Sequence, residues 1–355
     1  MKSSKKVTII DFSGKHLFIG IDVHKNNWVV TVRALNLELR TFSIDPFPQV
    51  LERILLRDYP GGIYHLVYEA GCFGYASFDY FNDKGIDIIV TPPNRVYRET
   101  GAIKTDKRDS RELAKQLDKE MLKKVIVPTQ QFRELRQMLR IRDNIQKRRK
   151  QIMNEITGML RFLNIRLETM SWGKSRVAEL KGLVFTQEAL SDSFALCISE
   201  YEFYSNKFSE INRLIKKHSQ TIGEYTDLIN RLTEIRGIGI LMATTIVLFL
   251  FDRKDRFESS GQLVHYLGLT PGEHSSGEKQ RKGGIVGGNP RLRAKIIQIA
   301  WKAVRWDPVL LDKYNRVYQH SGITQKAIVA VARKLMVRIY TIVQNNERYQ
   351  VGLAA

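Results

Sequence analysis

The sequence of 355 residues predicts an α/β domain followed by a mainly helical remainder. Residues 1–125 alternate short β-rich runs with segments of helical periodicity. From about residue 129 the β-rich runs stop, and apolar residues recur in steps of three and four. Charge changes at the same place: residues 1–125 carry 20 Lys and Arg against 16 Asp and Glu, whereas residues 126–355 carry 37 against 21. The chain therefore divides into a nearly neutral α/β part and a basic helical part.

The first part predicts a mixed sheet flanked by helices. Three β-rich runs separated by short polar breaks suggest a meander, and a helix with Pro near its start follows them. Strands and helices then alternate, which is typical of a sheet with helices on its faces. The predicted strands are 16–23, 27–34, 38–44, 63–70 and 86–91, and the predicted helices are 46–58, 73–83 and 107–120.

Two segments in the middle of the chain have coiled-coil-like spacing. Such helices either pair as an antiparallel hairpin, dimerise with a second chain, or belong to a packed helical core. The segment 171–190 between them has no readable motif, and we predict domains 1–125, 126–230 and 231–355. The spaced residues are Ile145, Ile152, Ile156, Met159 and Leu163 in the first segment, and Tyr201, Tyr204, Phe208, Ile211, Ile215, His218 and Ile222 in the second.

The last part contains a glycine turn and a basic glycine-rich segment. Gly237 and Gly239 lie between hydrophobic segments, as in the turn of helix-hairpin-helix DNA-binding modules. There the backbone N–H groups can approach a phosphate because glycine has no Cβ, although such turns have many other uses. Residues 275–295 hold six Lys or Arg, one Glu and five Gly, and helices follow to about residue 345. The residues predicted to contact phosphates in this segment are Arg281, Lys282, Arg291 and Arg293.

The net charge, the number of cysteines and the apolar stretches of the sequence exclude several classes of protein. A formal charge of +20 indicates a polyanionic partner, and phosphate backbones fit better than a membrane surface because no polybasic amphipathic anchor stands out. The two cysteines, Cys72 and Cys197, are too few and too far apart for a disulfide framework or a zinc site, which favours a reducing cytoplasm. The most apolar stretch, 238–251, is too short to cross a bilayer, so no membrane association is expected.

Four acidic residues in the first part suggest a metal site. Asp22 interrupts an apolar strand run, where burying a charge costs several kcal/mol unless it is paired or bound to a metal. Glu69 ends another strand run, and Asp106 and Asp109 lie three apart at the start of a helix, so they face the same side. Each has a simpler interpretation as a strand end or a helix cap. Together they could hold two Mg²⁺ ions about 4 Å apart for phosphodiester cleavage.

Several motifs resemble one family. GIDVHK (20–25), YEAG (68–71) and PPNRVYRETGAIKTDKRDSRELAK (92–115) are similar to the N-terminal domain of the DEDD transposases of bacterial insertion sequences. That domain has an RNase H-like, RuvC-type fold. The strings EIRGIGILMATTIV and YLGLTPGEHSSGEKQRKGGIVGGNPRLR are similar to the second conserved domain of the family. The resemblance covers roughly 16–125 and 231–340, and the middle matches only in being helical.

The resemblance implies a DNA transposase or recombinase in a bacterial cytoplasm, associated with the nucleoid, and some family members are guided by an element-encoded non-coding RNA. The acidic residues of the family map onto Asp22, Glu69, Asp106 and Asp109. The implied nucleophile is Ser276, or its neighbour Ser275; a plain turn serine before glycine is the simpler interpretation. The implied cofactor is Mg²⁺, with Mn²⁺ as the alternative, and a dimer or tetramer is expected.

Two other functions fit the same residues. One is a structure-specific RuvC-like endonuclease that uses water as its nucleophile. The other is a nucleic-acid-binding scaffold without catalysis, in which the glycine turn and the basic segment bind phosphates. His24 and Lys25 follow Asp22 closely and either lie near the metal ions or, as the preferred interpretation, are polar strand-end residues without a catalytic role.

Overall fold

The computed structural model describes residues 11–93, 105–270, 273–276, 279–282 and 287–352. For 273–276 and 279–282 the description covers only the backbone. The chain forms two compact units, Met1–Val127 and Pro128–Ala355, and each is described by itself.

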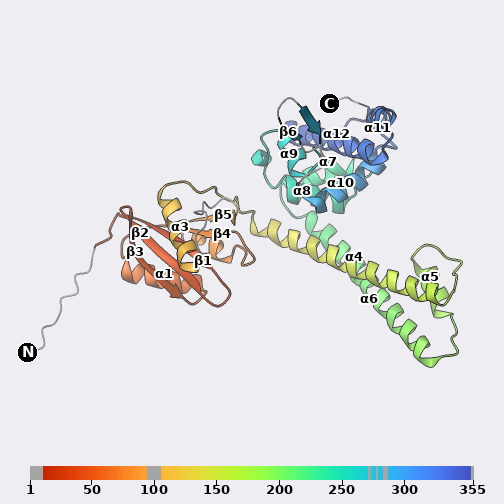
Figure 1. Ribbon diagram of the computed structural model, residues 1–355, viewed down its shortest axis with the longest axis horizontal. Helices are drawn as coiled ribbons and strands as arrows, with labels where there is room; N and C mark the ends of the chain where they lie inside the picture. The colour runs from red at the N-terminus through yellow and green to blue at the C-terminus, as the bar shows by residue number, and fades with distance from the viewer. Residues whose placement is uncertain (1–10, 94–104, 271–272, 277–278, 283–286, 353–355) are drawn as a thin grey trace, which may run out of the picture. The chain divides into compact units, whose positions relative to one another are not determined.

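The first unit contains the five predicted strands and three predicted helices, with bounds within three residues of those expected (Figure 1). The first helix begins at Pro48, whose fixed φ suits a first helical turn, and the second and third helices end directly before Lys84 and Lys119. The elements are β1 (His16–Val23), β2 (Trp28–Ala34), β3 (Leu37–Ile44), α1 (Pro48–Asp58), β4 (Ile63–Glu69), α2 (Ala76–Asp83), β5 (Asp87–Thr91) and α3 (Asp106–Asp118).

The strands form one mixed sheet in the order β3-β2-β1-β4-β5. The first three are an antiparallel meander, whereas β4 and β5 join β1 in parallel through the crossovers of α1 and α2. The mixed sheet flanked by helices is thus confirmed, and its strand order is consistent with an RNase H-like domain.

The two faces of this sheet differ. One face carries Ile19 and Ile21 of β1, which pack in a core with Leu51 of α1 and Phe81 of α2. The opposite face is covered by α3, whose Leu113 packs on the strands β4 and β5. Because side chains alternate along a strand, Gly20 and Asp22 lie on the face that α3 covers. Asp22 therefore lies on the side of the sheet next to α3, away from the apolar core of the other face.

The second unit is mainly helical, as predicted. Its long helices α4 and α6 run along each other in Figure 1. Its elements are α4 (Gln130–Phe162), α5 (Lys174–Lys181), α6 (Glu188–Ser219), α7 (Tyr225–Thr233), α8 (Ile240–Leu250), α9 (Ser260–Tyr266), β6 (Glu273–Ser276), β7 (Lys279–Lys282), α10 (Pro290–Ala303), α11 (Pro308–Ser321) and α12 (Thr324–Asn345).

The helices α4 and α6 form an antiparallel hairpin within one chain. Leu135 near the start of α4 shares a core with Ile215 near the end of α6, while Ile156 near the end of α4 packs with Ile198 near the start of α6. Between these cores the contacts are arginine–aromatic, with the Arg149 guanidinium 5.4 Å from the Tyr201 ring centroid. Of the pairings left open by the sequence, the intramolecular hairpin is the one observed, so most of the heptad-spaced apolar residues are buried inside the chain.

Two local features were not anticipated. The helix α5 lies in the segment that carried no motif, and its Val177 and Leu180 complete the core at the hairpin tip. The segment interpreted as a basic loop contains the antiparallel strands β6 and β7, in which Ser276 pairs with Lys279. A pair of four-residue strands is too short for a periodicity signal, because alternation needs several repeats to show.

The glycine turn has a packing role at one of its two glycines. It joins α7 to α8, and Gly237 adopts φ of +105° against α10, where a Cβ would lie 2.8 Å from the Cβ of Lys302. Gly239 precedes α8 and has no described atom within 4 Å of such a Cβ. Only Gly239 therefore leaves room for the close backbone approach that a phosphate contact requires. Among the described helices, none is long and apolar enough to cross a membrane.

Candidate active site

The parallel pairing of β1 with β4 places two of the predicted carboxylates side by side. Ile21 is in register with Tyr68, so the next residues, Asp22 and Glu69, occupy neighbouring positions at the carboxyl ends of two central strands. Residues in register on parallel strands point to the same face. Both carboxylates therefore lie on the face that α3 covers.

The helix α3 brings the remaining two carboxylates to this edge. Asp106 and Asp109 lie in its first turn, on one side of the helix. The helix approaches β1 closely over Gly20: a Cβ at this residue would lie 2.2 Å from the carbonyl oxygen of Ser110 and 2.5 Å from the amide nitrogen of Ala114. A glycine in GIDVHK thus sets how near the first turn of α3 comes to Asp22.

A buried chain of hydroxyl groups fixes the rotation of α3. The Thr31 hydroxyl of β2 lies 2.9 Å from the Ser110 hydroxyl of α3 and 2.9 Å from the Thr41 hydroxyl of β3. Ser110 also donates to the carbonyl of Lys107 in the first turn of α3. Thr31 and Ser110 are fully buried. This network ties the turn that carries Asp106 and Asp109 to the sheet.

We expect Thr31→Val to lower the free energy of unfolding by about 1–2 kcal/mol, because it removes a buried hydroxyl that bonds two others while keeping the side-chain shape. Urea unfolding monitored by hydrogen exchange of residues 11–93 would measure this loss. Thr157→Val is the matched control, because the Thr157 hydroxyl bonds only the Met153 carbonyl within its own helix, and its effect is read from the hydrogen exchange of α4, in which it lies. Equal stability of the two variants would contradict the role of the network.

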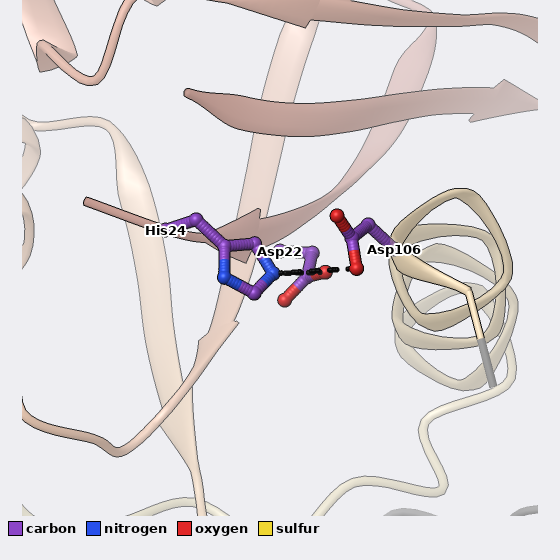
Figure 2. Close-up of side chains that lie close together, drawn as sticks. All are labelled: Asp22, His24 and Asp106. Atoms are coloured by element: carbon purple, nitrogen blue, oxygen red, sulfur yellow. Dashed lines mark hydrogen bonds and ion pairs between the residues drawn. The ribbon is translucent and has the colours of Figure 1, made fainter. Parts of the chain in front are cut away.

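His24 joins the site, although a role as a polar strand-end residue was the preferred interpretation of the sequence. Figure 2 shows its ring beside Asp22, both from the end of β1, with Asp106 opposite on α3. The His24 Nε2 lies 2.9 Å from Asp22 Oδ2 and 3.6 Å from Asp106 Oδ1. One ligand atom from each of the three residues lies within 4.8 Å of the others, as around a single ion. The spacing Asp-x-His on a strand was the available signal, because residues i and i+2 share a face.

The electrostatics of the site favour a bound cation. Burial raises the pKa of the Asp22 carboxyl, the His24 hydrogen bond opposes this rise, and the charges of Asp106 and Asp109 raise the pKa further. Three carboxylates therefore repel one another where water is partly excluded. A bound divalent cation would replace this repulsion by attraction, since each carboxylate would then stabilise the same ion.

The donor set fits a divalent metal. Asp22 and Asp106 would supply carboxylate oxygens, the ligands that Mg²⁺ and Mn²⁺ take, and His24 an imidazole nitrogen. The predicted ligands Glu69 and Asp109 are not among the three residues whose ligand atoms converge. Thr91 adds a polar group nearby: it is in register with Glu69, and its fully buried hydroxyl has no hydrogen-bond partner among the residues that the structure describes. A buried hydroxyl without a partner is costly unless water or an ion shell satisfies it.

The predicted nucleophile and two predicted phosphate contacts are described only by their backbone. Ser276 ends β6 and pairs with Lys279 of β7, whereas Arg281 and Lys282 lie farther along β7, opposite His274 and Glu273. The side chains of these three residues lie outside the described part of the chain, as does that of Ser275. Ser276 is thus the last described residue of β6, and the strand paired with it carries basic residues.

The other two predicted phosphate contacts have partners within the protein. The Arg291 guanidinium binds Asp143 of α4 at 3.0 Å and is half exposed. Arg293 donates to the carbonyls of Gly268 and Gly287, at 3.3 and 3.1 Å. It thereby joins the end of the glycine-rich segment to the turn after α9. Arg291 remains accessible to a phosphate, while Arg293 has a clear structural role.

The fold and the site together define a class of protein. A sheet of this order, with carboxylates at the ends of two parallel strands and on the covering helix, is consistent with RNase H-like enzymes that act on nucleic-acid phosphodiesters. Residues 19–165 match the family model of the DEDD transposase of IS110, described as a transposase, and residues 229–315 match the Transposase IS116/IS110/IS902 family. The protein is therefore a transposase of the IS110 family of insertion sequence elements, a DNA phosphotransferase whose DEDD domain implies a divalent metal ion.

Known transposases are similar over most of the chain. The y4qE protein of Sinorhizobium fredii, which is named as a transposase, is 28% identical over 81% of this chain and 72% of its own. The transposase for insertion sequence element IS1111A of Coxiella burnetii is 26% identical over 77% of this chain and 75% of its own. The transposase for insertion sequence element IS1533 of Leptospira borgpetersenii is 23% identical over 81% and 85%, respectively. The predicted transposase function is thus confirmed at the level of the family.

Proposed function

We propose that this transposase cuts and rejoins DNA strands through a phosphoserine intermediate, with Ser276 as the nucleophile and a metal site formed by Asp22, Glu69, Asp106 and Asp109. The observation that supports the proposal is the convergence of Asp22 and Glu69 on the sheet face covered by the acidic first turn of α3. The Ser-Gly hairpin lies within the second family match.

The chemistry balances in two transfers. The Ser276 oxygen attacks the scissile phosphorus, so a serine–phosphate bond forms while the bond to the leaving sugar oxygen breaks. The serine proton passes to a neighbouring base, and the leaving oxygen takes up a proton. A strand hydroxyl then attacks the phosphoserine, which restores the serine and forms a new phosphodiester. The number of phosphate ester bonds is conserved, so rejoining needs no external energy source.

The roles of the acidic residues follow from their positions. A divalent cation, when bound, supplies positive charge to the phosphate oxygens in the transition state. Asp22 and Glu69, on adjacent strands, would hold it from the sheet, and Asp106 and Asp109 would hold it from the first turn of α3. The mechanism requires Ser276 to meet this site, within one chain or between protomers of a homo-oligomer.

A covalent adduct would test the nucleophile. The transposase is incubated with element-end DNA and Mg²⁺ or Mn²⁺, and protein-linked DNA is separated under denaturing conditions. We expect an adduct from the native protein and from Ser275→Ala, and none from Ser276→Ala. Loss of the adduct in Ser275→Ala alone would move the role by one residue. Cleavage without any adduct, abolished by Asp22→Asn, would instead support a RuvC-like nuclease that uses water.

We also propose that an element-encoded RNA guides the protein to its target. The second unit carries most of the net positive charge, and α4 presents Arg140, Lys147 and Lys150 on its exposed surface. Such cations neutralise phosphates without reading bases, so another component must supply sequence selection. Sequencing the RNA that co-purifies with the protein would test this: one defined element-derived RNA supports guidance, and random cellular fragments contradict it.

A further inference from the structure

We propose that His24 is a direct nitrogen ligand of the metal ion, and that the site therefore prefers Mn²⁺ to Mg²⁺. This inference rests on the proposed metal site and adds a fifth ligand to its four carboxylates. It also addresses the choice between Mg²⁺ and Mn²⁺, because carboxylate oxygens bind both ions and do not distinguish them.

Backbone geometry directs His24 toward the carboxylates. His24 lies two residues after Asp22 and directly after the last residue of β1, and positions two apart on an extended chain share a face. Its Nε2 lies 2.9 Å from Asp22 Oδ2 and 3.6 Å from Asp106 Oδ1. Adjacent ligands of an ion bound at about 2.1 Å lie roughly 3 Å apart in octahedral geometry. The distance between the His24 and Asp22 ligand atoms already matches this value. The distance between those of His24 and Asp106 is longer, and a rotation of either side chain would shorten it.

The exposed fractions of the three side chains indicate which proposed ligand is held in place and which can move. The Asp22 side chain is 19% exposed, whereas those of His24 and Asp106 are 45% and 54% exposed. Asp22 is therefore the anchored ligand, and the two more exposed side chains can close on an ion without repacking the core. The buried Thr91 hydroxyl, without a partner among the described residues, is an independent sign of an additional polar group at this edge.

Ligand chemistry links the imidazole to metal preference. Mg²⁺ takes oxygen ligands and retains water, whereas an imidazole nitrogen suits the first-row transition metals. A set of carboxylates with one nitrogen therefore binds Mn²⁺ more tightly than an all-oxygen set would, while Mg²⁺ gains little. The alternative is that His24 only donates a hydrogen bond to Asp22 and never contacts the ion.

Nitrogen coupling to bound Mn²⁺ distinguishes these alternatives. The full-length protein is freed of metal and loaded with Mn²⁺ at less than one equivalent, and electron spin echo envelope modulation is recorded. We expect modulation from one coordinated imidazole nitrogen. It should be absent in His24→Ala and present in His320→Ala, which removes an exposed histidine of α11. Calorimetry should show Mn²⁺ affinity reduced at least about tenfold in His24→Ala, with a smaller change for Mg²⁺.

The outcomes separate this inference from the proposal on which it rests. Mn²⁺ binding that Asp22→Asn abolishes, but without nitrogen modulation, would overturn the role of His24 and leave the carboxylate site standing. Modulation that persists in His24→Ala would also overturn it, because another histidine would then be the ligand. Mn²⁺ binding that does not depend on Asp22 would contradict the proposed metal site itself. Circular dichroism of each variant verifies that the fold is retained.

Discussion

Asp22→Asn should lower the rate of strand transfer by about 10³-fold or more. The same substitution should make the metal-free protein more stable. Burial raises the pKa of Asp22, and the charges of Asp106 and Asp109 add to this, so the ionised carboxylate is unfavourable in the folded state. A carboxyl whose folded pKa is raised reduces stability as the pH rises through that pKa. Asparagine keeps the shape and the acceptor for His24 but removes the charge. We expect the Tm to rise by roughly 1–4 °C at neutral pH.

Two controls make this result specific. The difference in Tm should shrink as the pH falls toward about 4, because Asp22 becomes neutral in both states. Asp83→Asn, at the exposed end of α2, should change neither Tm nor activity. Added Mn²⁺ should raise the Tm of the native protein but not that of Asp22→Asn, since binding to the folded state alone stabilises it. A variant that loses both stability and activity would show that Asp22 is structural.

Gly20→Ala should destabilise the N-terminal unit by about 2–4 kcal/mol, although it adds a single methyl group. The new Cβ would lie 2.2 Å from the Ser110 carbonyl oxygen and 2.5 Å from the Ala114 amide nitrogen. Both are backbone atoms in the middle of α3, so no side chain can rotate away and the helix must move. Its first turn carries Asp106 and Asp109. Strand transfer should therefore fall by about 100-fold even in molecules that remain folded.

Hydrogen exchange of residues 11–93 measures the stability loss separately from the helical unit. Gly71→Ala is the matched control, because its Cβ would have only one described neighbour, the Glu69 carbonyl oxygen at 3.9 Å. It should leave exchange rates nearly unchanged. If Gly20→Ala exchanged like Gly71→Ala, then α3 would not pack on β1 as closely as the structure shows.

Local patterns accounted for most of the N-terminal unit. Alternating apolar residues identified β1, β2 and β4 because each strand buries at least one face, and that signal lies within a few residues of sequence. The helix α5 was missed because its short sequence KSRVAELK has little amphipathic pattern. The strands β6 and β7 were missed because four polar residues each give no alternation.

The partners of the long helices depended on distant residues. The heptad spacing on α4 and α6 was compatible with either a hairpin or a dimer, because the same apolar stripe serves both. Burial of Ile156 against Ile198 and of Leu135 against Ile215 selected the hairpin. If the protein is an oligomer, its contact must use other surfaces, such as the exposed Phe162 and Val184 near the hairpin tip.

The sequence by itself determined the strands and the helix that carry the proposed metal site, and it provided the candidate ligands Asp22, Glu69, Asp106 and Asp109 from their positions in these elements. The tertiary structure alone decided that the His24 Nε2 lies 2.9 Å from Asp22 and 3.6 Å from Asp106, and that Gly20 sets how closely α3 approaches β1. The physical reason is the separation along the chain of the residues involved. Periodicity records which face of its own element a residue occupies, whereas the approach of α3 to β1 depends on backbone atoms some 90 residues apart in the chain, which no local pattern encodes.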